Sequence, residues 1–217
     1  MAEITLKKVS YQTKNNAILE NIDFVVESGS WVTLAGPSGS GKSTILKLIA
    51  DLISPTSGVV EFEGRNIQTI DPIDYRRQVS YAAQSAQLFG ETVKDNLDFP
   101  YLIRKKEIDS DRQAAVLNDF DLSSDFLTHS ILDISGGQRQ RVGLARNFIF
   151  MPKVVLLDEV TTGLDSDSKK IVRQVIEKEN KKGLTVIEVT HEIDDLKEAK
   201  QIYTLSNGQI TKGVLHE

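Results

Sequence analysis

A glycine-rich stretch near the N-terminus has the residues needed to hold a chain of phosphates. It reads Gly36-Pro37-Ser38-Gly39-Ser40-Gly41-Lys42-Ser43-Thr44 and fits the phosphate-loop pattern, in which backbone N–H groups surround the phosphates. In that pattern the lysine reaches the terminal phosphates, and the hydroxyl that follows it binds Mg²⁺. The stretch therefore predicts a site for ATP and Mg²⁺; the plain alternative is a flexible glycine turn.

Two carboxylates follow an apolar run in the second half of the chain. Val154 to Leu157 reads as a buried strand, and Asp158 and Glu159 come directly after it. In an open parallel sheet, ligands gather at the carboxyl ends of the strands. Asp158 then suits Mg²⁺ coordination together with Ser43 and waters, and Glu159 suits polarising the water that attacks a phosphate. A solvated strand end is the alternative interpretation.

A second glycine turn precedes another predicted helix. Ser135-Gly136-Gly137-Gln138 leads into Arg139 to Phe148, where apolar residues recur at helical spacing. Its free N–H groups and the helix dipole favour an anion, although a serine N-cap would give the same pattern. Because the first loop already surrounds one nucleotide, we expect this turn to cap the γ-phosphate held by a second copy in a head-to-tail dimer.

The elements that carry these residues follow from hydrophobic periodicity and turn signals. The first third predicts a strand-rich start, and one helix follows the glycine loop. Residues 91–150 contain helix formers such as Arg104 to Glu107 and Gln113 to Leu117, so we expect a helical insert there. The predicted strands are Ile4–Tyr11, Asn21–Glu27, Trp31–Ala35, Gly58–Glu63, Val79–Ala83, Val154–Leu157 and Thr185–Thr190. Besides Arg139–Phe148, the predicted helices are Thr44–Leu52 and Ser166–Lys182, the latter closed by Gly183.

The alternation of strands and helices after Lys153 predicts an α/β fold with a mostly parallel sheet covered by helices. Asn207-Gly208 lies between short apolar runs in residues 201–210 and predicts a tight hairpin.

The composition excludes several function classes. A net charge of -5 gives no general attraction to nucleic acid, which needs clustered Lys and Arg. The absence of cysteine excludes disulfides and thiolate metal sites. No apolar run approaches the ~20 residues that span a bilayer, and the N-terminus does not have the pattern of a signal peptide. We therefore expect a cytoplasmic chain without a nucleic-acid partner.

Taken together, four features resemble the ATP-binding cassette subunits of ABC transporters: the phosphate loop, ISGGQRQR at 134–141, VVLLDE at 154–159, and His191. The resemblance covers nearly the whole chain. It implies a P-loop (RecA-like) domain over residues 1–217, with an antiparallel β lobe at 1–30 and 56–70. The core would comprise 31–55, 71–90 and 151–217, and the helical subdomain 91–150.

The resemblance also implies roles that the residues alone do not. Tyr11 matches the aromatic residue that stacks on adenine, and Gln84 the glutamine that contacts Mg²⁺ or the attacking water. Asp165 matches the loop that crosses the dimer interface, although as an isolated residue it reads as a helix N-cap. His191 matches the histidine that hydrogen-bonds the γ-phosphate.

A narrower resemblance concerns the ATPase subunits of two-component Fet-type iron exporters. It rests on LISPTSG at 52–58, residues 75–100 and RNFIFMPKVVLLDE at 146–159. It implies a subunit held on the inner face of the cell membrane by a polytopic permease, which would dock near Gln84 to Pro100, with iron or another metal as the exported substrate. Alternatives are a soluble ABC ATPase, for example of the iron-sulfur assembly type, and a nucleotide-binding regulator without turnover.

Overall fold

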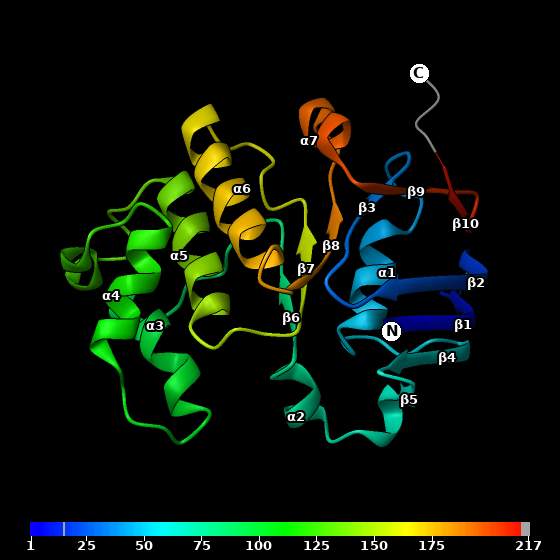
Figure 1. The fold of residues 1–217 in the computed structure, drawn as a ribbon, viewed down its shortest axis with the longest axis horizontal. Coiled ribbons are helices and arrows are strands. Elements are labelled where there is room, and N and C mark those ends of the chain that lie inside the picture. The colour runs from blue at the N-terminus through cyan, green and yellow to red at the C-terminus, as the bar shows by residue number, and fades with distance from the viewer. Residues whose placement is uncertain (15, 214–217) are drawn as a thin grey trace.

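The computed structural model describes residues 1–14 and 16–213, which form two sheets and the helices around them (Figure 1). The smaller sheet is antiparallel and contains β1 (Ala2–Gln12), β2 (Ala17–Glu27), β4 (Ser57–Phe62) and β5 (Arg65–Asn66). The larger sheet contains β3 (Trp31–Ala35), β6 (Val79–Ala82), β7 (Val154–Asp158), β8 (Thr185–Val189), β9 (Gln201–Ser206) and β10 (Gln209–Lys212). The helices are α1 (Lys42–Ile49), α2 (Pro72–Arg76), α3 (Val93–Leu102), α4 (Ser110–Asp119), α5 (Gly136–Phe148), α6 (Ser166–Asn180) and α7 (Ile193–Glu198), with single 3₁₀ turns at Ile67–Thr69 and Ser124–Thr128.

The order of strands in the larger sheet is β10-β9-β3-β8-β7-β6. All neighbouring pairs are parallel except the hairpin of β9 and β10. Because parallel strands end at the same edge, the segments after β3, β8, β7 and β6 lie side by side although they are far apart in the sequence. The fold thereby gathers four separate segments along one edge of the sheet.

Strands β3, β7 and β8 of the larger sheet are buried on both faces. Along β7, Val154 and Leu156 belong to an apolar cluster shared with α1 and the smaller sheet, and Val155 and Leu157 to a second cluster shared with α3 to α6. Side chains alternate between the faces of a strand, so a strand covered on both sides must be apolar throughout. In Figure 1 these helices lie to the left of the sheet, and α1 and the smaller sheet to the right.

The predicted fold class is confirmed, whereas several element bounds differ. The predicted helix Thr44–Leu52 instead spans Lys42–Ile49; it ends where Asp51 takes a left-handed conformation (φ 53°). The helix formers Arg104 to Glu107 are not helical: the first two lie in a turn, with Lys105 at φ 51°, and the other two lie in the irregular segment that follows. Helix propensity alone was therefore a wrong guide there. Residues 214–217 of the expected core lie outside the described residues.

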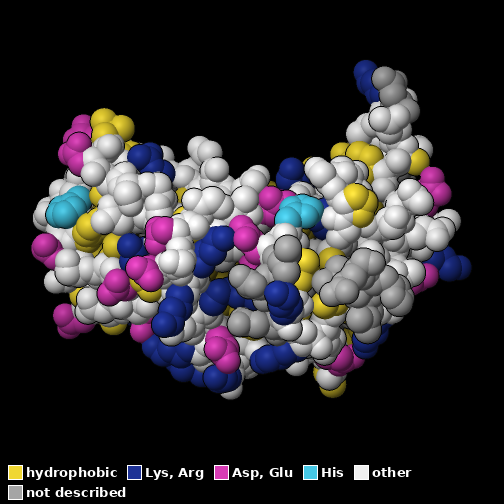
Figure 2. Space-filling model, turned by 90° about the horizontal axis from the view of Figure 1, so that it is seen from above, with side chains coloured by type: hydrophobic (Ala, Val, Ile, Leu, Met, Phe, Trp, Pro, Cys, Tyr) yellow, Lys and Arg dark blue, Asp and Glu magenta, His cyan; other side chains and the backbone are white. Residues whose placement is uncertain are grey.

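Within the described ranges, no helix combines the length and apolar character that crossing a membrane requires. On the face seen in Figure 2, basic side chains gather along the lower middle edge of the view, and acidic ones lie mostly to the left of them and above.

Candidate ATP site

The phosphate loop connects β3 to α1 and is shaped by its glycines. Gly36, Gly39 and Gly41 all have positive φ, at 136°, 78° and 101°. A Cβ on Gly36 would lie 2.1 Å from the carbonyl oxygen of Leu205 in β9, so glycine is required there. The Lys42 ammonium donates to the carbonyls of Gly36 (2.8 Å) and Pro37 (2.9 Å) and stays inside the loop. Burial lowers the pKa of Lys42, and the negative charges of Glu159 and Asp158 oppose that effect.

Asp158 lies opposite the start of α1. The Ser43 hydroxyl donates to its Oδ1 (2.8 Å), and the Tyr81 hydroxyl of β6 donates to its Oδ2 (2.7 Å). Burial, followed by this hydrogen bond to a carboxylate, raises the pKa of Tyr81. Tyr81 therefore remains a proton donor that orients the Asp158 carboxylate toward Ser43.

Glu159 lies between Gln84 and His191. Gln84 Nε2 donates to its Oε2 (3.1 Å), and His191 Nε2 lies 3.0 Å from its Oε1. The backbone of Glu159 is left-handed (φ 53°), a conformation that costs free energy in any residue with a Cβ, and its N–H donates to Val189 at the end of β8. The three side chains expected to act on water and phosphate are thus brought together.

Lys42, Ser43, Glu159 and His191 border one cavity of about 230 Å³, whereas Gln84 and Asp158 are not among its lining residues. It is lined by Ile18, Ser38, Gly39, Gly41, Lys42, Ser43, Thr44, Glu159 and His191. Tyr11 is not among the lining residues: it lies on β1, opposite Leu19 of β2. Its stacking on adenine stays a prediction, as do the roles of Gly36, Pro37 and Ser40 in contacting phosphate.

The second glycine turn lies elsewhere, against the start of α6. Ser135 caps α5: its hydroxyl accepts from the N–H of Gln138, whose side chain accepts from the N–H of Ser135. A Cβ on Gly137 would lie 2.9 Å from the hydroxyl of Ser168 and 3.4 Å from a carboxylate oxygen of Asp165. The turn does not line the cavity at the phosphate loop. It therefore lies away from the place where phosphates would bind to the loop of its own chain.

Asp165 is the N-cap of α6, accepting from the N–H (2.8 Å) and hydroxyl (2.9 Å) of Ser168. The hydrogen bond from the Ser168 N–H, and then that from its hydroxyl, lower the pKa of Asp165. The N-cap interpretation is therefore correct, and the role at a dimer interface stays a prediction.

Sequence reasoning missed Tyr81 and Ile18. No motif marks either residue, and only the pairing of β6 with β7 and the approach of β2 to the loop bring them to the site. The short helix α2 was also missed, although Asp71 before Pro72 is a recognisable N-cap followed by proline at the first helical position.

Comparison with known proteins agrees with this geometry. The sequence profile of the ABC transporter family matches residues 19–162. The chain belongs to the ABC transporter family and is an ATPase of that family.

Individual relatives and structures are consistent with the family. The Escherichia coli (strain K12) "Probable iron export ATP-binding protein FetA" is 44% identical over 203 residues, covering 93% of this chain and 90% of that protein. ABC transporter B family member 1 of Dictyostelium discoideum is 34% identical over all of this chain, which spans only 25% of that longer protein.

Two solved structures share the fold. The ATP-binding cassette MJ0796, a dimer in a post-hydrolysis state with ADP and Pi, superposes with a TM-score of 0.86 at 28% identity, covering 99% of both chains. A bacterial Atm1-family ABC exporter with ATP bound superposes with a TM-score of 0.89 over 98% of this chain and 38% of its own, at 24% identity.

Proposed function

We propose that the chain hydrolyses MgATP as one half of a head-to-tail dimer and drives a separate membrane permease that exports iron or another metal ion. One observation carries the hydrolytic assignment. The order β3-β8-β7-β6 places the phosphate loop, His191, the pair of Asp158 and Glu159, and Gln84 along one edge of the sheet.

The residues at this edge suit phosphoryl transfer to water. Lys42, now bonded to loop carbonyls, would turn toward the β- and γ-phosphates. Glu159 would accept a proton from the attacking water, and His191 would donate to a γ-phosphate oxygen. Gln84 holds the Glu159 carboxylate and would help to orient that water.

The side-chain oxygens of Ser43 and Asp158 are suitable ligands for a magnesium ion. A hydroxyl and a carboxylate oxygen 2.8 Å apart are the hard oxygen ligands that Mg²⁺ prefers. Among the described residues no cluster of three or more His, Asp or Glu could hold a metal by itself. Waters and phosphate oxygens would complete the coordination. A bound magnesium ion would neutralise charge on the phosphates.

The dimer would complete the site, because the turn at Ser135 to Gln138 lies away from the loop of its own chain. Similarity to the dimeric MJ0796 structure supports this arrangement. Each Ser135 turn, together with Asp165, would then reach the γ-phosphate held by the other copy.

Substitution Glu159→Gln tests both steps. We expect this variant to bind ATP, to stop turning it over and to accumulate as a dimer, measured by phosphate release and by light scattering during gel filtration. Glu177→Gln, the same change at an exposed position on α6, is the control and should behave like the parent protein. Normal turnover by Glu159→Gln, or a monomer in saturating ATP, would contradict the proposal.

The surface near Gln84 to Pro100 supports a permease partner. A groove of about 150 Å³ there is lined by the exposed side chains of Phe99 (40%) and Ile103 (51%), and Arg76, Arg77 and Arg104 are also among its lining residues. An apolar centre with a basic rim suits a partner segment that carries apolar side chains flanked by acidic ones.

Phe99→Asp tests the docking surface. This variant should keep its basal ATPase activity in solution and lose its recovery in the membrane fraction of the cells that produce it. Leu132→Asp is the matched control, since Leu132 is 81% exposed at a different place. Equal membrane recovery of both variants would place the docking surface elsewhere.

The transported substrate is inferred from the E. coli relative. Deleting the gene should raise the cellular content of iron, or of another metal if that is the cargo, as measured by elemental analysis. Normal metal content under metal excess would refute metal export and leave the ATPase assignment unaffected.

A further inference from the structure

Behind the ATP site, a buried carboxylate joins two segments that carry site residues. Asp195 on α7 accepts hydrogen bonds at Oδ2 from the hydroxyls of Thr161 (3.1 Å) and Thr190 (3.0 Å). All three residues are buried, with 8%, 3% and 2% of their surfaces exposed. Thr161 follows Glu159 by two positions, and Thr190 directly precedes His191.

Asp195 is itself held by Arg173 on α6. Arg173 Nε lies 3.2 Å from Asp195 Oδ1, and its NH1 lies 2.6 Å from the carboxylate of Glu188 on β8. The other carboxylate oxygen of Glu188 accepts from the Thr33 hydroxyl of β3 (2.7 Å). This cluster therefore connects α6 and α7 to the two strands that lead into the phosphate loop and His191.

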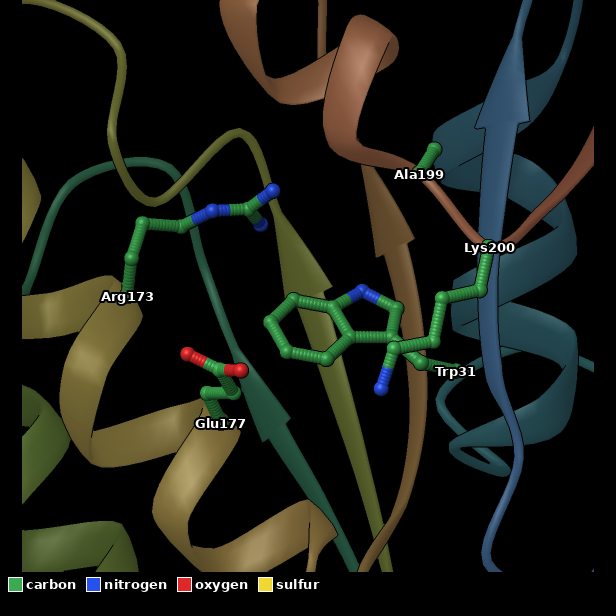
Figure 3. A pocket seen from close by; sticks show the side chains of 5 residues that line it. All are labelled: Trp31, Arg173, Glu177, Ala199 and Lys200. Atoms are coloured by element: carbon green, nitrogen blue, oxygen red, sulfur yellow. The ribbon is translucent and has the colours of Figure 1, made fainter.

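The indole of Trp31 covers the guanidinium of Arg173. Figure 3 shows Arg173 reaching from α6 toward the Trp31 ring, and its Cζ lies 4.7 Å from the ring centroid. Such contact restricts the orientation of the guanidinium and so the direction of its N–H groups. Arg173 is thus a rigid support for Asp195 rather than a mobile surface side chain.

The backbone between Asp158 and Thr161 needs such support. Glu159 is left-handed, which costs about 1 kcal/mol or more and persists only where the surroundings impose it. A charged acceptor shared by Thr161 and Thr190 ties the segment after Glu159 to the segment before His191. Because these two segments also carry Glu159 and His191, the shared hydrogen bonds to Asp195 help to set the 3.0 Å distance between His191 Nε2 and Glu159 Oε1.

We propose that Asp195 is a positioning residue for ATP hydrolysis, which sets the relative placement of Glu159 and His191 through the hydroxyls of Thr161 and Thr190. The inference rests on the proposed roles of Glu159 and His191. Asp195 does not line the cavity at the phosphate loop, so it acts on the chemical step and not on the binding of nucleotide.

Asp195→Ala is the first test, made on the purified full-length chain. We expect kcat to fall about 10- to 100-fold, because small displacements of catalytic groups have effects of that size, while the ATP affinity stays within about 3-fold of the parent value. Trp31 is the single tryptophan, so an unchanged emission spectrum would show that the Arg173 contact survives. An unchanged kcat, or an equal loss of ATP affinity, would overturn the proposal.

Thr161 offers a second test that does not depend on Asp195→Ala folding. Thr161→Val keeps the shape of the side chain but removes the hydroxyl, so kcat should fall; Thr161→Ser keeps the hydroxyl and should restore most of it. Combining Thr161→Val with Asp195→Ala should cost little beyond Asp195→Ala alone, because both break the same tie. Equal activity of the Val and Ser variants, or additive losses, would refute the positioning role.

Two further variants separate this inference from the proposed function. Glu177 lies one turn after Arg173 on α6 and lines the same pocket at Trp31, but it is outside the hydrogen-bonded cluster of Asp195. The kcat of Glu177→Gln should therefore match that of the parent protein. If Glu159→Gln abolishes turnover while Asp195→Ala does not, only the positioning role fails. If Glu159→Gln turns over normally, the assignment of Glu159 itself fails.

Discussion

The contact between α5 and the segment after Gln84 allows a quantitative prediction for Gly143→Ala. A Cβ on Gly143 would lie 2.5 Å from the Cβ of Ala86, about 1 Å inside normal carbon contact. The segment cannot move away freely, because the Ala86 N–H donates to the Gln140 side chain (2.8 Å), which in turn donates to the Ala83 carbonyl (3.4 Å).

The magnitude is the balance of two effects. Overpacking of this kind costs about 2 kcal/mol, and replacing a helical glycine by alanine returns about 1 kcal/mol. We expect Gly143→Ala to lower the free energy of unfolding by about 1 kcal/mol. It should also reduce ATPase activity, because displacing the segment disturbs the 3.1 Å contact between Gln84 and Glu159.

The measurement is a double-mutant cycle with Ala86→Gly, in which urea denaturation gives the free energy of unfolding of each variant. Removing the Ala86 Cβ makes room for the new one, so the two substitutions should show a coupling energy of about 2 kcal/mol. Gly136→Ala is the control, since a Cβ there meets nothing within 4 Å. A coupling energy within about 0.5 kcal/mol of zero would refute the reasoning.

Three further predictions concern the site and its supports. The hydrogen bonds at the start of α6 lower the pKa of Asp165, so its stabilising contribution is present above the ordinary value of 3.8 and is lost as the pH falls below it. Asp165→Asn should therefore show a smaller fall of thermal midpoint from about pH 6 to about pH 3 than the parent, and an equal fall would contradict this. Tyr81→Phe removes one donor to the buried Asp158 and should destabilise the fold by about 1 to 2 kcal/mol in urea denaturation; unchanged stability would disprove it. Gly36→Ala places a Cβ against the carbonyl of Leu205 and should weaken ATP binding at least about 10-fold by calorimetry, so near-normal affinity would mean that the loop tolerates a side chain.

Much of the site was predictable because its signals are local. Glycine spacing specifies a loop that closes on phosphate, and Lys42 and Ser43 follow within the same few residues. The apolar run of Val154 to Leu157 predicted a buried strand, and in the structure every residue of this strand is buried between β8 and β6.

The errors occurred where local propensity competes with distant contacts. Arg104 to Glu107 are good helix formers, yet α3 ends at Leu102 and the chain turns there. The extent of β2 was underestimated because its first residues, Ala17 to Glu20, form a strand by pairing with the end of β1. Pairing of this kind depends on a partner that the segment itself does not contain.

The sequence by itself determined the phosphate loop, the apolar strands and the turn at Ser135, since each depends on residues within about ten positions of one another. Only the tertiary structure decided that β8 lies between β3 and β7, which places His191 3.0 Å from Glu159. It also decided that Tyr81 orients Asp158 and that Asp195 joins Thr161 to Thr190. These contacts come from the order of strands and the packing of α6 and α7, which many weak interactions set together.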